Sequence, residues 1–132
     1  MSATLDTNVV LRLVLRDIPE QYEVVRAMVT ARGARYRVTD AVINETVYAL
    51  IHHYGLSRPQ VAEIVRSIIW DPAIEANKDL IESAITLFIE HQALSYTDCY
   101  LAEEARISGN VPLFTFDHKL ATQHTVAKEP KR

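Results

Sequence analysis

Cysteine, glycine and long hydrophobic runs are scarce in this chain, and each scarcity excludes a class of protein. Cys99 is the only cysteine, so no disulfide can form within the chain and a disulfide-stapled scaffold is excluded. No hydrophobic run approaches the roughly 20 residues that a membrane-spanning helix needs. With only 3 glycines, the chain has no glycine-rich phosphate loop, which excludes a nucleotide hydrolase of that kind.

Positive charge is also in short supply. The chain has 14 Lys and Arg against 17 Asp and Glu, a net charge of −3. A protein that binds nucleic acid through backbone charge alone is usually basic, so the composition gives no support to a simple nucleic-acid-binding module. It does permit an enzyme in which metal ions bridge acidic protein groups to phosphate.

The length and composition suit a single compact domain. The 132 residues are 48% hydrophobic and 23% charged, which is enough to form a hydrophobic core without disulfides. Residues 1–6 lack the basic stretch and apolar run of a secretory signal. We therefore expect a cytoplasmic protein with no membrane partner, made of one domain over residues 1–127 and a polar tail over residues 128–132.

Short extended segments alternate with helical patterns along the chain. Strands are predicted at 2–5, 36–39, 73–76, 112–116 and 125–127, and helices at 8–15, 20–31, 41–54, 57–70, 78–92 and 96–108. The first segment is expected to be a buried central strand. Strands separated by helices imply right-handed crossovers, and so predict a three-layer α/β/α fold with a central parallel sheet of four to five strands.

Four acidic residues lie where such a sheet forms its sites, beyond the carboxyl ends of the strands. Asp6 and Asp117 directly follow predicted strands, and Glu45 and Asp98 lie early in predicted helices. Each acid also has an ordinary explanation. Asp6, Asp98 and Asp117 can satisfy helix ends, and Glu45 can be a solvated helix residue.

Taken together, the four acids favour a metal site. Carboxylates about 5 Å apart repel by roughly 3 kcal/mol per pair at an effective dielectric constant of 20, so a cation must offset the repulsion. Oxygen ligands with no histidine or cysteine beside them suit a hard ion, Mg²⁺ or Mn²⁺.

Four ordered fragments containing these acids carry a resemblance to a known family. They are 5–11 (LDTNVVL), 43–47 (INETV), 94–98 (LSYTD, followed by Ala102 and Ala105) and 113–117 (LFTFD). On these fragments the chain resembles the PIN-domain nucleases, and within them the VapC-like ribonuclease toxins of bacterial toxin–antitoxin pairs. The resemblance spans nearly the whole chain and implies a PIN-like fold.

The resemblance also implies a chemistry and a set of partners. It implies an endoribonuclease that hydrolyses RNA phosphodiester bonds with a water activated by Mg²⁺ or Mn²⁺. It implies RNA as substrate, a small cognate antitoxin as partner and a homodimer. The residues implied as catalytic and metal-binding are Asp6, Glu45, Asp98 and Asp117, and those implied to orient them by hydrogen bonds are Thr7, Asn8, Thr97 and Thr115.

The chain departs from the family pattern after its last acid. A further acid often stands two positions later in the family, where this chain has Lys119, and an aromatic residue is replaced by Leu120. Candidate phosphate contacts are Arg12, Arg16, His118 and Lys119, although ordinary surface solvation explains such residues at least as often.

Three other interpretations compete with a toxin nuclease. A haloacid-dehalogenase-like phosphatase needs a second Asp two positions after the first, where this chain has Asn8, which counts against it. A catalytically silent PIN-like module that binds protein or RNA is the non-enzymatic alternative, and the intact acids argue against it. A PIN nuclease outside toxin–antitoxin systems remains the third.

Overall fold

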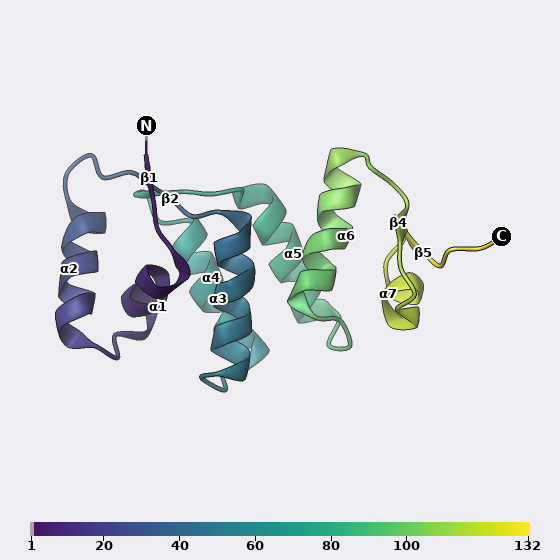
Figure 1. Ribbon diagram of the computed structural model, residues 1–132, viewed down its shortest axis with the longest axis horizontal. Helices are drawn as coiled ribbons and strands as arrows, with labels where there is room; N and C mark the ends of the chain where they lie inside the picture. Colours follow the sequence, from purple (N-terminus) through teal and green to yellow (C-terminus); the bar gives the residue numbers. More distant parts are fainter. Residues whose placement is uncertain (1) are drawn as a thin grey trace. The chain divides into compact units, whose positions relative to one another are not determined.

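The computed structural model describes residues 2–132, which form two compact units, Met1–Lys78 and Asp79–Arg132 (Figure 1). Among the described residues, no helix is both long and apolar enough to cross a lipid bilayer. Helices and strands alternate along the chain in the order β1 (Ala3–Thr4), α1 (Thr7–Leu15), α2 (Pro19–Thr30), β2 (Tyr36–Arg37), α3 (Asp40–His52), α4 (Arg58–Ile69), β3 (Ile74–Glu75), α5 (Lys78–Glu90), α6 (Tyr96–Ser108), β4 (Leu113–Phe114), α7 (His118–Gln123) and β5 (Ala127–Lys128).

The N-terminal unit contains a parallel three-stranded sheet in the order β1-β2-β3. Helices connect its strands, which confirms the predicted α/β class and parallel pairing. The prediction that the first strand is buried and central is wrong for this sheet. β2 holds the centre because its backbone bonds to both neighbours, with Leu5 N donating to Arg37 O and Val38 N to Glu75 O, each at 2.9 Å.

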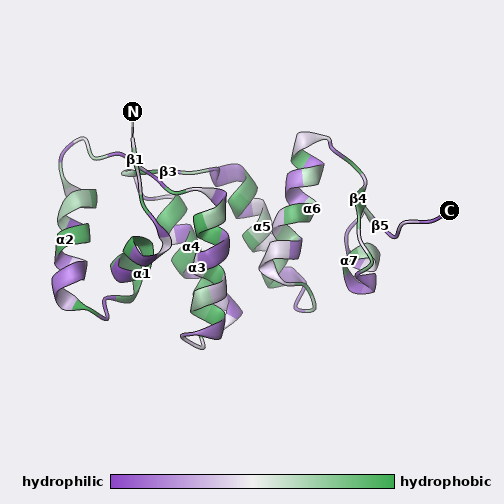
Figure 2. Ribbon diagram, in the orientation of Figure 1, coloured by the Kyte–Doolittle hydropathy of each residue, from purple (hydrophilic) through white to green (hydrophobic). Residues whose placement is uncertain are grey.

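Helices pack around this sheet through their apolar faces. α1 contacts α2 and α3, α3 contacts α4, and α4 contacts β3. Figure 2 shows hydrophobic and hydrophilic bands alternating along α3, as expected for a helix with one buried face. The buried residues of α3 are Ile43, Thr46, Val47, Ala49 and Leu50. This pattern leaves the remaining face of α3, which carries Glu45, exposed.

The C-terminal unit contains α5, α6 and a parallel pair of strands, β4 and β5, with α7 between them. The five strands are thus divided between a three-stranded and a two-stranded sheet, where the sequence predicts one central sheet. A crossover of about a dozen residues suffices for parallel pairing, so β4 finds its partner directly after α7. β5 includes Lys128, the first residue assigned to the polar tail. Cys99 is fully buried in α6.

A buried ionic network ties α6 to the end of α7 within this unit. Glu103 on α6 accepts hydrogen bonds from His124 Nε2 at 2.7 Å and from Arg106 Nη2 at 2.9 Å. Burial alone raises the pKa of the Glu103 carboxyl, but the hydrogen bonds from Arg106 and His124 outweigh it, so the pKa lies below its ordinary value. The ionised carboxylate therefore stabilises the folded state above the unfolded-state pKa, about 4.3, and this stabilisation is lost as the pH falls through the folded-state pKa.

Replacing Glu103 by Gln should expose this contribution. Glu103→Gln keeps the size of the side chain but removes its charge, so we expect the free energy of unfolding at neutral pH to fall by about 1–2 kcal/mol. The difference from the wild type should shrink below about pH 4. Urea unfolding at both pH values measures it, with Glu90→Gln, an exposed acid at the end of α5, as the matched control. An equal loss at both pH values would contradict the proposed role of the charge.

Candidate functional site

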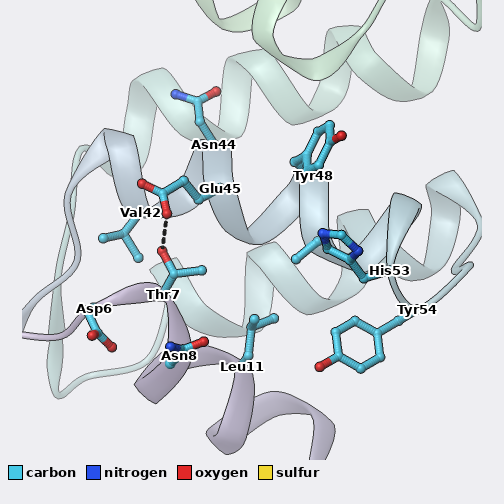
Figure 3. A pocket seen from close by; sticks show the side chains of 11 residues that line it. Asp6, Thr7, Asn8, Leu11, Val42, Asn44, Glu45, Tyr48, His53 and Tyr54 are labelled. Carbon is cyan, nitrogen blue, oxygen red and sulfur yellow. Dashed lines mark hydrogen bonds between the residues drawn. The ribbon is translucent and has the colours of Figure 1, made fainter.

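An open pocket of about 690 Å³ lies between the start of α1 and one face of α3, within the N-terminal unit (Figure 3). Its two ends differ in chemistry. We call the part formed by Asp6, Thr7, Asn8 and Glu45 the acid end, and the part formed by Tyr48, His53 and Tyr54 the aromatic end. The remaining lining residues are Leu11, Val42, Asn44 and Ala49.

Asp6 has a structural role at the acid end, as a helix cap. It is the N-cap of α1, and its Oδ1 accepts a hydrogen bond from Val9 N at 3.0 Å. That bond occupies one carboxylate oxygen and fixes the direction in which the carboxylate points. The expected helix-end role is therefore present, and the same side chain also lines the pocket.

Glu45 reaches the acid end from α3, where its side chain is exposed. Thr7 Oγ1 donates a hydrogen bond to Glu45 Oε2 at 3.1 Å (Figure 3), so the first residue of α1 holds the carboxylate of α3. Asp6 and Glu45, which are 39 positions apart in the sequence, are thus brought to one pocket.

The other two predicted acids, Asp98 and Asp117, belong to the C-terminal unit, and both lie at the start of a helix. Ser95 is the N-cap of α6, and its Oγ accepts a hydrogen bond from Asp98 N at 3.2 Å. Asp117 is the N-cap of α7, and its Oδ1 accepts from Lys119 N at 2.9 Å. Thr115 Oγ1 accepts from the backbone N–H of Asp117 at 2.9 Å, so this threonine contacts the backbone of the acid. Of the residues expected to orient the acids, Thr97 is exposed on α6.

The acid end offers oxygen donors suited to a hard divalent cation. Within residues 2–78, no three acidic, histidine or cysteine side chains lie close enough to hold a metal ion by themselves. Asp6 and Glu45 supply two carboxylates, with the Thr7 hydroxyl and the Asn8 amide beside them. Mg²⁺ is commonly held in proteins by one or two carboxylates, with water and substrate phosphate completing its shell, so this donor set fits the ion.

Two of the residues predicted to contact phosphate, Arg12 and Arg16, interact with other side chains of the N-terminal unit. The Arg12 side chain is 15% exposed, pairs with Asp17 Oδ2 at 3.2 Å and donates to the Tyr54 hydroxyl at 3.1 Å. Arg12 therefore supports a wall of the pocket. The Arg16 guanidinium lies 5.0 Å from the centre of the Tyr22 ring.

The other two lie in the C-terminal unit. The Nδ1 atom of His118 lies 3.3 Å from Glu129 Oε1, and Lys119 is exposed. These positions place both side chains at the start of α7, beside Asp117.

Sequence reasoning did not identify the aromatic end. The site residues predicted from the sequence do not include Tyr48, His53 or Tyr54. The available signal was spacing, because Glu45 and Tyr48 are three positions apart and so share a helix face. The contact of Tyr48 with His52 follows the same rule, because the two residues are four positions apart on α3, whereas the contact with His53 depends on the geometry at the end of that helix.

Comparison with known proteins gives one family. The family model of the PIN domain matches residues 3–124. The crystal structure of VapC20 from Mycobacterium tuberculosis, described as a sarcin-ricin loop cleaving toxin, aligns with a TM-score of 0.44 and 16% identity over 96% of this chain and 99% of that one. No curated protein matches the sequence.

Truncation of Arg12 should weaken the fold. Arg12→Ala removes the hydrogen bond to Tyr54 and the ion pair with Asp17, so we expect the free energy of unfolding to fall by about 1–2 kcal/mol. Arg16→Ala is the matched control and should cost less than about 1 kcal/mol, because it removes only an exposed cation–π contact. Thermal and urea unfolding of both variants measures the difference. Equal losses would show that the Arg12 contacts do not stabilise this wall.

Proposed function

Because the chain belongs to the PIN domain family, we propose that it is a metal-dependent endoribonuclease that hydrolyses phosphodiester bonds in RNA. The observation that carries the proposal is the meeting of Asp6 and Glu45 in one pocket, with Thr7 holding the second carboxylate.

We propose that residues 1–127 form a single domain. We also propose that the acids of its active site are Asp6, Glu45, Asp98 and Asp117. The first two are supported by the pocket, and the last two by the sequence resemblance. The bound Mg²⁺ or Mn²⁺ would lower the pKa of a water molecule and offset the negative charge of the transition state. Glu45, held by Thr7, is suited to accept a proton from the attacking water.

The biological setting that we propose follows the sequence resemblance. It is a cytoplasmic toxin, acting as a homodimer and neutralised by a small cognate antitoxin. A PIN nuclease outside toxin–antitoxin systems would share the active site and lack that partner. A catalytically silent module would bind RNA or protein and leave RNA intact.

Asp6→Asn separates catalysis from helix capping. Asn caps a helix about as well as Asp, so the variant should unfold at the same free energy or higher in the absence of metal, since repulsion between carboxylates is relieved. Loss of a hydrogen-bonded neighbour of a metal ligand typically costs 10–100-fold in activity, so loss of a ligand should reduce RNA cleavage at least about 100-fold. Asp98→Asn should do the same.

Cleavage is measured on structured RNA with Mg²⁺ or Mn²⁺, and EDTA should stop it. Asp79→Asn, an acid in the first turn of α5, is the matched control and should cleave normally. If the Asp6→Asn and Asp98→Asn proteins are folded and cleave as the wild type does, the assignment of the acids is wrong. If the wild type leaves RNA intact with either ion, the nuclease proposal fails.

Loss of the Thr7–Glu45 hydrogen bond should lower kcat without changing stability. Thr7→Val keeps the shape of the side chain and removes the donor, so we expect kcat to fall about 10-fold with little change in the free energy of unfolding. Thr7→Ser keeps the hydroxyl and should retain most of the activity. Single-turnover cleavage of one RNA by the two variants checks this. Equal rates for both would show that the hydroxyl does not position the carboxylate.

A further inference from the structure

We infer that the aromatic end of the pocket holds an unpaired nucleobase of the RNA, stacked on Tyr48, beside the phosphate that the acid end attacks. This inference rests on the proposed function and adds a residue that positions the substrate. It starts from a ring that has no role in the acid chemistry and yet lines the same cavity.

Tyr48 is placed to reach a nucleotide bound at the acid end. It follows Glu45 by three residues on α3, which corresponds to about 4.5 Å along the helix axis and to the same face. Figure 3 shows Glu45 and Tyr48 projecting from successive turns of α3, with the acid and aromatic ends side by side. Tyr48 is 59% exposed and lines the pocket, so a bound group can contact its side chain.

The ring of Tyr48 is held in place by its neighbours. Its centroid lies 4.4 Å from that of His52 and 5.8 Å from that of His53, the latter edge-on at 74°. An aromatic side chain has few rotatable bonds, and these contacts restrict them further. Stacking a base on the ring would therefore cost little additional side-chain freedom.

Tyr54 and His53 provide the polar groups that a base edge needs. The Tyr54 hydroxyl oxygen accepts from Arg12 Nη2 at 3.1 Å, which leaves its own O–H able to donate. His53 lies between Tyr48 and Tyr54 in Figure 3 and adds a ring nitrogen. Unpaired RNA bases are recognised in this way, by stacking on aromatic side chains and hydrogen bonding along their edges.

The chemistry of this end suits a base. The pocket is open here, and Tyr48 and Tyr54 are 59% and 41% exposed, so a flat aromatic group can lie against a ring and meet polar groups at its edge. A stacked base requires only one accessible ring face and nearby edge donors, and both are present. The neighbouring carboxylates also place the ring beside the proposed cleavage chemistry.

The test uses the full chain and a single-stranded RNA that the wild type cleaves at a mapped site. Tyr48→Ala should raise KM by roughly 10-fold with little change in kcat, because base stacking contributes to binding. Tyr48→Phe keeps the ring and should retain wild-type KM. Trp70→Ala is the control, since Trp70 is similarly exposed at 51% and does not line the pocket.

A second measurement changes the RNA as well as the protein. An abasic nucleotide placed in turn at each position near the cut should raise the wild-type KM at one position, and should have no further effect there in Tyr48→Ala. With 2-aminopurine at that position, wild-type protein in EDTA should quench its fluorescence and Tyr48→Ala should not.

The outcomes distinguish this inference from the proposed function. If the wild type cleaves RNA, but neither Tyr48→Ala nor an abasic nucleotide changes KM, the stacking site is refuted and the nuclease stands. If Tyr48→Ala binds RNA normally and loses a protein partner instead, the ring is a protein-docking surface and the inference is also refuted. If the wild type cleaves no RNA, the proposed function fails first.

Discussion

The hydrogen bond from Val9 N to Asp6 Oδ1, 3.0 Å long, fixes where β1 ends and α1 begins, and the geometry of the acid end depends on it. Once α1 starts at Thr7, helical geometry determines where Thr7 and Asn8 point. Thr7 then meets Glu45 across the pocket. A helix cap is therefore part of the site, and the structural and functional interpretations of Asp6 describe the same side chain.

Two of the other predicted acids also lie at the starts of helices. Asp117 caps α7 with Oδ1, and Asp98 lies in the first turn of α6 behind the Ser95 cap. Helix N-termini favour negative charge, so an acid at these positions is compatible with a stable fold. This explains how Asp6, Asp98 and Asp117 fit the starts of their helices, whereas Glu45 lies further along α3 and has no role at a helix end.

The sequence indicated the helices more reliably than the sheet. Gly55 and Gly109 end helices with positive φ, and Ser57 with Gln60 forms a capping box, all signals that local sequence carries. The strands are two residues long, and their pairing is decided by distant partners, so the exposed edge position of β1 could not be read from residues 2–5. The convergence of Asp6 and Glu45 on one pocket was predictable because sites form beyond strand ends, whereas Tyr48 has the sequence pattern of any exposed helix residue.

The charges that line the pocket of the N-terminal unit would make the proposed binding of RNA depend on the binding of an ion. Arg12, the basic residue that contacts the pocket wall, is already paired with Asp17 and bonded to Tyr54. Among the described residues that line this pocket there is no lysine or arginine, so a polyanionic substrate would meet the carboxylates of Asp6 and Glu45 uncompensated. A divalent ion there would reverse the sign of the local field, as bound cations do when they are the largest local charge. The stacking surface proposed at Tyr48 would give RNA an attraction that does not depend on charge, and would complement a pocket that needs an ion to attract phosphate.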